Sequence, residues 1–170
     1  MLKIGICGFG TVGQSFVDHI VSHGDKIRSN VSKDFDIDVI ADRSIDKKEY
    51  PSGIKITKNP LDLPLDSDLD IIIELLGGID LPYKIITQSI KNKKHIITAN
   101  KALIAEHGDE IFKLAKQHNV YFGYEASVAG AIPIISTLTK NMVNENIISI
   151  VGIINGTCNY ILDQMSSYNL

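Results

Sequence analysis

The chain has 170 residues, of which 44% are hydrophobic and 22% are charged, and its formal net charge is −3. These values are those of an ordinary globular protein, and they exclude a surface that attracts nucleic acid or an anionic membrane. No run approaches the roughly 20 apolar residues that a membrane span needs. The cysteines, Cys7 and Cys158, have no metal or redox spacing, which favours reduced thiols in a cytoplasmic protein.

Strand and helix patterns alternate along the first three quarters of the chain. The predicted strands are short apolar runs, and the helices between them have apolar residues at helical spacing. Apolar strands separated by helices indicate an α/β fold, a doubly wound parallel sheet covered on both faces. In chain order we predict a strand at 3–7, a helix at 11–23, a strand at 36–42, a strand at 70–76, a helix at 82–92, a strand at 95–99, a helix at 102–119 and a strand at 120–126.

Two stretches depart from this alternation. Residues 43–69 contain prolines and many charges, and we expect a long connection with little regular structure. Beyond residue 130 the pattern predicts a helix at 131–143, a strand at 146–154 and a helix at 157–167. We expect 1–130 to form one domain and 131–170 to begin a second, α+β domain. One strand and two helices cannot cover themselves, so we expect the chain to be a fragment or to need a partner.

A glycine triplet with the spacing Gly8-x-Gly10-x-x-Gly13 directly follows the first strand and opens the first helix. This context is typical of the Rossmann dinucleotide-binding fold. Gly8 allows the tight turn, Gly10 lets a pyrophosphate approach the backbone, and Gly13 lets the helix pack on the strand. The first domain is therefore predicted to bind NAD or NADP, with cofactor contacts from Gly8, Phe9, Gly10, Thr11, Val12 and Gly13, and from Gly77 and Gly78 after the strand at 70–76.

The end of the second strand, Asp42-Arg43, bears on the choice of cofactor. Asp42 can accept hydrogen bonds from two ribose hydroxyls, which favours NAD and repels a 2′-phosphate. Arg43 can instead pair with that phosphate, which favours NADP. The two residues conflict, and the balance leans slightly to NAD.

Five motifs in this order resemble those of homoserine dehydrogenase over nearly the whole chain: GFGTVG (8–13), ELLGG (74–78), TANKAL (98–103), YEASVAGAIPII (124–135) and GIINGTCNYIL (152–162). The last two motifs are absent from dinucleotide-binding proteins in general. The resemblance implies an oxidoreductase that interconverts L-aspartate 4-semialdehyde and L-homoserine with NAD(P), in the branch of amino-acid biosynthesis that leads to threonine, methionine and isoleucine. It also implies a nucleotide-binding domain followed by a catalytic and dimerisation domain, and hence a homodimer at full length.

The resemblance also assigns roles to individual residues. Lys101 corresponds to a catalytic lysine at the junction of cofactor and substrate, and Gly156 and Thr157 correspond to residues that contact the substrate. A monovalent cation site, usually for sodium, corresponds to Glu125 and the backbone of Val128, Gly130 and Ile132. This chain has Ala131 where the common form of the motif has glycine. A second catalytic lysine and acidic substrate ligands lie beyond Leu170 in the family.

The position of Lys101 agrees with the catalytic role, because it lies just past the carboxyl end of a predicted strand, where ligands bind in parallel sheets. Hydride transfer to an aldehyde builds negative charge on its oxygen, which a cation or proton donor stabilises. The alternative is a surface lysine in a loop.

For the chain as a whole, the alternative to an enzyme is a dinucleotide-binding fragment or sensing module without turnover. For Glu125, the alternative to a cation ligand is a carboxylate that binds a helix N-terminus.

Overall fold

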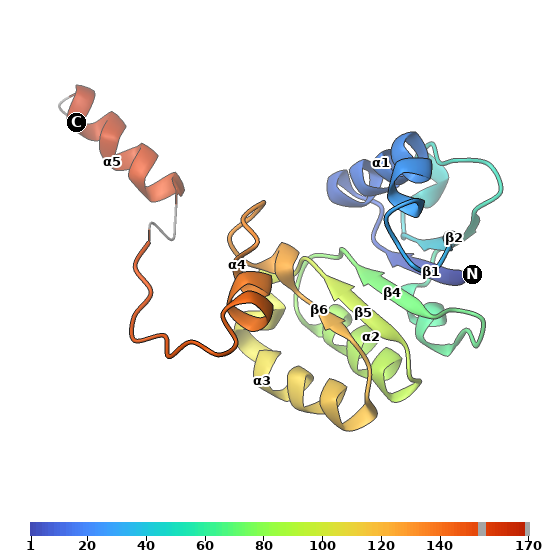
Figure 1. Ribbon diagram of the computed structural model, residues 1–170. Helices are drawn as coiled ribbons and strands as arrows, with labels where there is room; N and C mark the ends of the chain where they lie inside the picture. The colour runs from blue at the N-terminus through green and yellow to red at the C-terminus, as the bar shows by residue number, and fades with distance from the viewer. Residues whose placement is uncertain (153–155, 169–170) are drawn as a thin grey trace.

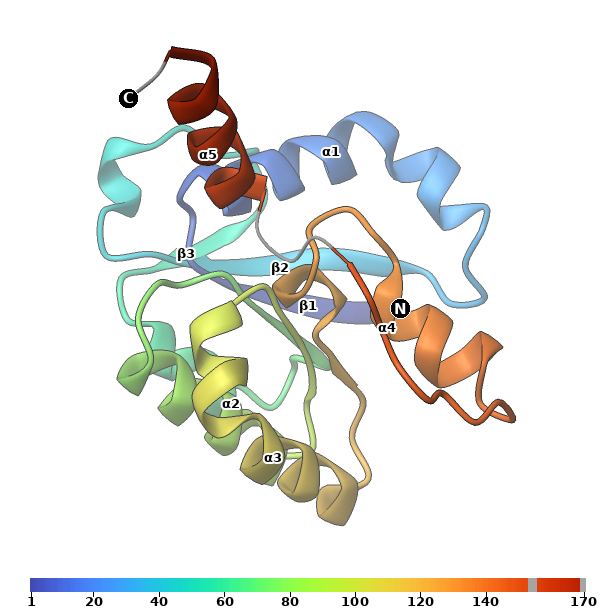
Figure 2. The same ribbon diagram turned by 90° about the vertical axis from the view of Figure 1, so that its left-hand side faces the viewer.

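The structure is a computed structural model that describes residues 1–152 and 156–168. A six-stranded parallel sheet with the strand order β3-β2-β1-β4-β5-β6 forms its centre, which confirms the predicted Rossmann-type fold. Helix α1 covers one face and helices α2 and α3 cover the other (Figures 1 and 2). The strands are β1 Leu2–Cys7, β2 Phe35–Ala41, β3 Lys55–Thr57, β4 Ile71–Glu74, β5 His95–Thr98 and β6 Phe122–Gly123, and the long helices are α1 Thr11–Arg28, α2 Asp80–Lys91, α3 Lys101–His118 and α5 Gly156–Tyr168.

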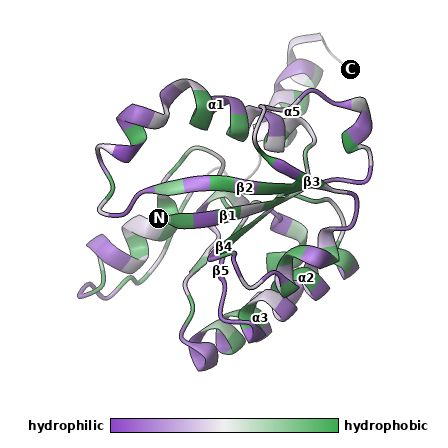
Figure 3. Cartoon of the chain, turned by 90° about the vertical axis from the view of Figure 1, so that its right-hand side faces the viewer, coloured by the Kyte–Doolittle hydropathy of each residue, from purple (hydrophilic) through white to green (hydrophobic). Residues whose placement is uncertain are grey.

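The core has two halves, one on each face of the sheet, because successive strand residues point to opposite sides. On one face, Ile6 and Ile40 pack with Val17 of α1. On the other, Ile72 and Ile96 pack with residues of α2 and α3 such as Ile86. Figure 3 shows the strands coloured mainly as hydrophobic. Among the described residues, none of the helices combines the length and the apolarity that a membrane crossing requires.

Coverage of the sheet is less complete than predicted on the α1 side. An apolar groove of about 340 Å³ runs along this face between α1 and the middle strands, and Ile97 of β5 is 37% exposed there. The physical reason is that α1 is the one long described helix whose side chains pack on this face, and it lies over β1 and β2 (Figure 2).

Helix α1 is longer than predicted, because Gly24 lies inside the helix and does not end it. A Cβ atom at Gly24 would lie 2.9 Å from the Arg28 guanidinium, so the bare glycine leaves room for that side chain. The helix ends instead at Arg28, and the side chains of the next two residues, Ser29 and Asn30, both donate to the Lys26 carbonyl, at 2.8 and 2.7 Å.

The stretch 43–69 is more regular than predicted. Strand β3 pairs in parallel with β2, Ile40 opposite Ile56, and so extends the sheet at its edge. Two short 3-10 helices, Ile45–Lys47 and Pro60–Leu65, flank it. Asn59 caps the second one by accepting from the Leu61 amide. The composition of this stretch concealed a strand that forms only because β2 supplies its hydrogen-bonding partner.

The predicted strand at 120–126 is wrong in extent, and the one predicted at 146–154 is absent from its described residues, 146–152. Strand β6 has only two residues, because the chain turns at Glu125 into a 3-10 helix, Glu125–Ser127, tied to β5 by a hydrogen bond from Ser127 Oγ to the Thr98 carbonyl (2.9 Å). Residues 146–152 form no strand, since no described strand lies beside them. Residues 153–155 lie outside the described part.

The helices after residue 130 are those predicted, with different limits. Helix α4, Ile134–Ser136, continues as a π-helical turn, Thr137–Asn141, and is shorter than the predicted 131–143. Helix α5 stands apart from the helices that cover the sheet (Figure 1), and its described residues are almost all exposed. The assignment of 1–130 and 131–170 to two domains stays a prediction.

Candidate active site at the carboxyl edge of the sheet

The glycine loop connects the end of β1 to the start of α1. Gly8 has a φ of +102°, a conformation that favours glycine, and a Cβ there would lie 2.7 Å from the Leu75 carbonyl oxygen. A Cβ at Gly13 would lie 2.2 Å from the Gly8 carbonyl oxygen, so the start of α1 can approach the loop only with glycine at this position. A Cβ at Gly10 would meet nothing within 4 Å. The space beside Gly10 is therefore open to a ligand and not filled by the protein.

The first turn of α1 offers amides to that open space. Gly10 is the N-cap residue and has no side chain to accept from the helix amides, and no acidic residue lies in the first turn. Thr11 and Val12 are exposed, the latter at 57%. Unpaired amides at the positive end of a helix dipole bind phosphate. The loop thus fits the pyrophosphate of a dinucleotide.

Asp42 follows β2 and lies against the glycine loop. Its Oδ2 accepts from the Phe9 amide at 2.8 Å, and its Oδ1 accepts from the amide and the hydroxyl of Ser44, both at 2.8 Å. Lys48 Nζ lies 2.9 Å from Oδ2 and also donates to the Phe9 carbonyl at 2.7 Å. Burial, the largest single influence, raises the Asp42 pKa, but the hydrogen bonds from Lys48, Phe9 and Ser44 together hold it well below its usual range. Asp42 is therefore ionised and paired with a lysine, while Arg43 beside it is exposed.

Gly77 and Gly78 lie in the loop after β4, at the same edge of the sheet. Gly78 has a φ of +81°, and its carbonyl accepts from Asn100 Nδ2 at 2.7 Å. The loop is therefore fastened to the beginning of α3. Because β1 and β4 are neighbours, Gly8 and this loop come together: the Leu75 amide donates to the Cys7 carbonyl at 2.8 Å.

Lys101 is the first residue of α3, directly after β5, and its side chain is exposed. Asn100 precedes it as the N-cap and accepts from the Leu103 amide at 3.1 Å. A lysine here places its positive charge at the positive end of the helix dipole, which is unfavourable for the helix. The order β1-β4-β5 brings Lys101 to the same edge of the sheet as the glycine loop.

Glu125 and the turn after it form a separate feature. Its carboxylate oxygens accept from the amides of Ile135 and Ser136, at 2.9 and 2.8 Å. Burial raises the pKa of Glu125, but the hydrogen bonds from these amides lower it, and the net result is a pKa below its usual value. In the turn, Ala129 and Ala131 have positive φ values of 46° and 65°.

Backbone oxygens of the same turn are partly used. The Ile132 carbonyl accepts from the Ile134 amide at 2.8 Å, and Val128 and Gly130 lie on either side of Ala129. Among the described residues, no group of three or more His, Cys, Asp or Glu side chains could hold a metal ion, so a cation here would depend on Glu125 and carbonyl oxygens.

The substrate-contact residues are not brought to this edge. Gly156 begins α5, which stands apart from the sheet (Figure 1). Thr157 falls in the same helix, but its side chain lies outside what the structure describes.

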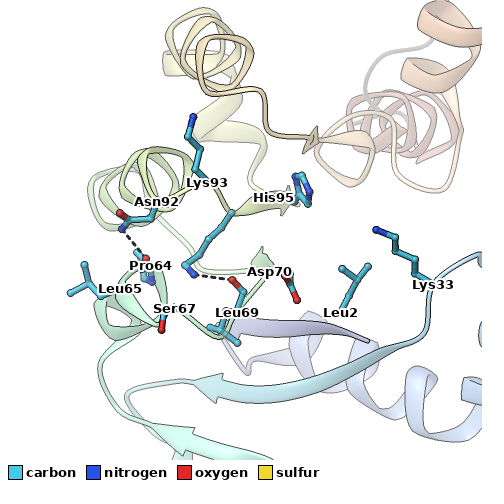
Figure 4. Close-up of a pocket in the computed structure, with 11 residues that line it drawn as sticks. Leu2, Lys33, Pro64, Leu65, Ser67, Leu69, Asp70, Asn92, Lys93 and His95 are labelled. Atoms are coloured by element: carbon cyan, nitrogen blue, oxygen red, sulfur yellow. Dashed lines mark hydrogen bonds between the residues drawn. The ribbon is translucent and has the colours of Figure 1, made fainter.

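A cavity of about 610 Å³ opens at the opposite, amino edge of the sheet (Figure 4). Two of its polar side chains, Lys94 and Asn92, bind backbone carbonyls at this edge. Lys94 Nζ donates to the carbonyls of Leu69 (2.8 Å) and Asp66, and Asn92 Nδ2 donates to that of Pro64 (2.9 Å). Ligands of parallel sheets bind at the carboxyl ends of the strands, so this cavity does not belong to the candidate site.

Three further residues lie at the carboxyl edge without a role predicted from the sequence: Lys48, Glu74 and Thr98. Glu74 ends β4 in full burial, and Thr98 Oγ1 donates to it at 2.5 Å. The one available signal was a carboxylate and a hydroxyl at the ends of two apolar strands. Nothing in the sequence indicated that Lys48 would reach Phe9.

Comparison with known proteins agrees with this architecture. Residues 8–125 match the sequence model of the homoserine dehydrogenase NAD-binding domain, and residues 133–170 match that of homoserine dehydrogenase. A homoserine dehydrogenase of Synechocystis sp. is 42% identical over 98% of this chain. The chain spans 38% of the length of that curated relative.

Solved structures give the same result. A homoserine dehydrogenase from Thiobacillus denitrificans superimposes with a TM-score of 0.90 at 37% identity, and the match covers 98% of this chain and 39% of the other. A hyperthermophilic archaeal homoserine dehydrogenase, solved in complex with NADPH, has a TM-score of 0.69 over 85% of this chain and 50% of its own. At 24% identity it shows the shared fold alone. The glycine loop, the order of the strands and the two matching sequence models together show that the chain belongs to the homoserine dehydrogenase family.

Proposed function

We propose that the protein carrying this chain is an NAD(P)-dependent oxidoreductase that interconverts L-aspartate 4-semialdehyde and L-homoserine by hydride transfer. The observation that supports this most directly is the convergence of the glycine loop and Lys101 at one edge of the sheet, through the neighbouring strands β1, β4 and β5. Family membership supplies the substrate pair. A nicotinamide dinucleotide supplies or accepts the hydride when it is bound.

The residues at this edge have distinct roles in the proposed reaction. The amides at the start of α1, beside Gly10, bind the pyrophosphate. Lys101 stabilises the charge that develops on the aldehyde oxygen, or holds the proton that this oxygen receives. Gly156 and Thr157 contact the amino-acid substrate in this proposal. For that, α5 has to come to the carboxyl edge in the complete protein.

Replacement of Lys101 tests the proposal. In the full-length protein, Lys101→Ala should lower kcat about 100-fold or more, with cofactor affinity within about threefold, because the lysine acts on the substrate oxygen and not on the pyrophosphate. Lys113→Ala, on an exposed position of the same helix, is the matched control and should keep the wild-type kcat. A normal kcat for Lys101→Ala would remove Lys101 from the mechanism.

The cofactor choice is proposed to include both NAD and NADP. Lys48 neutralises Asp42, which weakens the repulsion that an unpaired aspartate exerts on a 2′-phosphate. The exposed Arg43 adds a guanidinium suited to phosphate. This shifts the balance away from the slight preference for NAD that Asp42 alone indicated. The archaeal enzyme with the same fold was solved with NADPH.

A monovalent cation, sodium in the family pattern, is proposed to bind at Glu125 and the backbone oxygens of Val128, Gly130 and Ile132. The carboxylate oxygens each keep a lone pair after accepting one amide, and oxygen ligands suit a hard cation. A crystal soaked in thallium or rubidium should give an anomalous peak beside Glu125. Its absence would leave Glu125 with only its role at the start of α4.

A homodimer is proposed for the full-length protein. Apolar side chains are exposed between α4 and α5 and on α5 itself, among them Ile148 at 97%, Val151 at 94% and Leu162 at 61%. Exposed apolar patches of this kind mark contact surfaces. Light scattering on the full-length protein should give twice the subunit mass.

Cofactor binding without turnover is the alternative, and the distance of α5 from the carboxyl edge favours it for these 170 residues by themselves. Reduced cofactor and aspartate semialdehyde distinguish the two functions. Oxidation of the cofactor supports the enzyme, and binding without oxidation supports the binding module.

A further inference from the structure

Glu74 connects two segments at the carboxyl edge that are far apart in the sequence. It ends β4, between Cys7 of β1 and Thr98 of β5, and its side chain is fully buried. Its Oε1 accepts from the Leu76 amide at 2.7 Å, and its Oε2 accepts from Thr98 Oγ1 at 2.5 Å. Both carboxylate oxygens thus bind segments that leave the sheet towards the candidate site.

The contacts continue from Thr98 to the start of α3. Thr98 Oγ1 accepts from the Asn100 amide at 3.0 Å. Asn100 in turn caps α3 through the Leu103 amide and donates from Nδ2 to the Gly78 carbonyl at 2.7 Å. The network therefore runs from Glu74 through Thr98 to Asn100, the residue before Lys101, and returns to the loop that follows Glu74.

Stability alone does not account for a carboxylate at this position. Burial raises the pKa of Glu74, and the hydrogen bonds from Thr98, Leu76 and Asn100 offset only part of this effect. Burying a group whose ionised form is disfavoured lowers the free energy of unfolding, and a well-packed apolar group of similar volume avoids this cost. What the carboxylate supplies is two acceptors that fix the end of β5 and the loop after β4 in one geometry.

We propose that Glu74 is a positioning residue for Lys101, which it holds at the carboxyl edge through Thr98 and Asn100. The proposal rests on the proposed function, because it requires Lys101 to act on the substrate. Its physical basis is that catalytic groups must be held to fractions of an ångström by hydrogen bonds behind them.

The test uses near-isosteric variants in the full-length protein. In Glu74→Gln, the remaining oxygen can still accept from the Leu76 amide. The new Nε2 group is a donor, so it cannot accept the hydrogen bond that the Thr98 hydroxyl donates to Glu74 in the wild type. Thr98→Val removes the hydroxyl and keeps the shape, while Thr98→Ser restores it. Lys94→Met is the matched control: it removes a buried charge from the amino edge of the same sheet.

Glu74→Gln and Thr98→Val should each lower kcat about tenfold, with the cofactor KM within about threefold, and Thr98→Ser should return kcat to near the wild-type value. On the Lys101→Ala background, Glu74→Gln should add no further loss, since a residue that acts through Lys101 has nothing left to position. Lys94→Met should alter thermal stability and leave kcat near the wild-type value. An unchanged kcat for Glu74→Gln, or losses that multiply with Lys101→Ala, would overturn the proposal while leaving the proposed function intact.

Hydrogen exchange separates this proposal from failure of the proposed function. If the wild-type protein does not convert the semialdehyde, the proposed function is wrong, and the positioning role is then judged from exchange alone. Amides of 75–78 and 98–103 should exchange faster in Glu74→Gln than in the wild type, with no such change in Lys94→Met. Equal exchange of these segments in Glu74→Gln and the wild type would overturn the positioning role.

Discussion

Lys48 binds Asp42 and the glycine loop at the same time: its ammonium lies 2.9 Å from Asp42 Oδ2 and 2.7 Å from the Phe9 carbonyl oxygen. Asp42 itself accepts from the Phe9 amide. The residue expected to recognise the ribose is thus joined to the loop expected to bind the pyrophosphate, and its charge is already balanced by a cation. Cofactor choice should therefore depend on the Asp42–Lys48 pair and not on Asp42 alone.

Removing Lys48 should change the cofactor preference. Lys48→Ala leaves Asp42 as an unbalanced carboxylate, which repels a 2′-phosphate, so the ratio of the Kd for NADP to the Kd for NAD should rise about tenfold. Titration calorimetry with both cofactors measures this ratio. Lys55→Ala, which breaks the more exposed pair with Asp38, should leave it unchanged, and an unchanged ratio in Lys48→Ala would contradict the role of Lys48.

The pH dependence of stability should reveal the Asp42 interactions. Because the pKa of Asp42 is held below its usual range, the folded protein binds fewer protons at this group than the unfolded chain. The resulting stability is present above the unfolded pKa of about 3.9 and is lost as the pH falls towards the folded value.

Urea unfolding of wild type and Asp42→Asn tests this expectation. The wild type should be the more stable at pH 7, and the difference should shrink below about pH 4. Asp46→Asn, at an exposed ion pair with Lys58, should show almost no difference at either pH. A difference for Asp42→Asn that grows on acidification would contradict the low pKa.

Replacing two glycines of the loop by alanine should affect different properties: cofactor affinity at Gly10 and stability at Gly13. Gly10→Ala should leave the free energy of unfolding within about 0.5 kcal/mol, because its Cβ meets nothing within 4 Å. It should raise the cofactor Kd, since the methyl group occupies the space of the pyrophosphate. Gly13→Ala should lower the free energy of unfolding by about 1–3 kcal/mol or prevent folding, because its Cβ would lie 2.2 Å from the Gly8 oxygen. Thermal unfolding and cofactor titration together check both, and wild-type affinity in Gly10→Ala would place the pyrophosphate elsewhere.

Replacing Ala131 by glycine should stabilise the folded protein. Its φ of +65° is costly for alanine, so Ala131→Gly should raise the free energy of unfolding by up to about 1 kcal/mol. Ala105→Gly is the control, because this exposed residue lies inside α3 and its replacement should lower the free energy of unfolding by about 1 kcal/mol. Denaturant unfolding compares the two, and a loss in Ala131→Gly would show that this backbone is not strained.

Local signals in the sequence predicted a large part of the fold. The strands β1, β4 and β5 are centred on apolar runs, β2 alternates aspartates with apolar residues at its start, and the glycine triplet lies where a strand passes into a helix. Both features depend only on residues close together in the sequence, so they can be predicted without knowing which segments become neighbours in the fold. The expected edge of the site also followed, because parallel strands share one carboxyl edge.

Elements that depend on a neighbour were predicted poorly. Strand β3 exists because β2 is beside it, and 146–152 is no strand because no described strand pairs with it.

The sequence by itself determined the fold class, the position of the glycine loop and the candidate lysine, because period, glycine spacing and chain order act over short distances. Only the tertiary structure decided what surrounds them. Lys48 reaches Phe9 from 39 residues away, and Glu74 reaches Thr98 from 24 residues away. These contacts depend on which strands become neighbours and on where a polar group is buried. Neither of these can be deduced from the residues that are adjacent in the sequence.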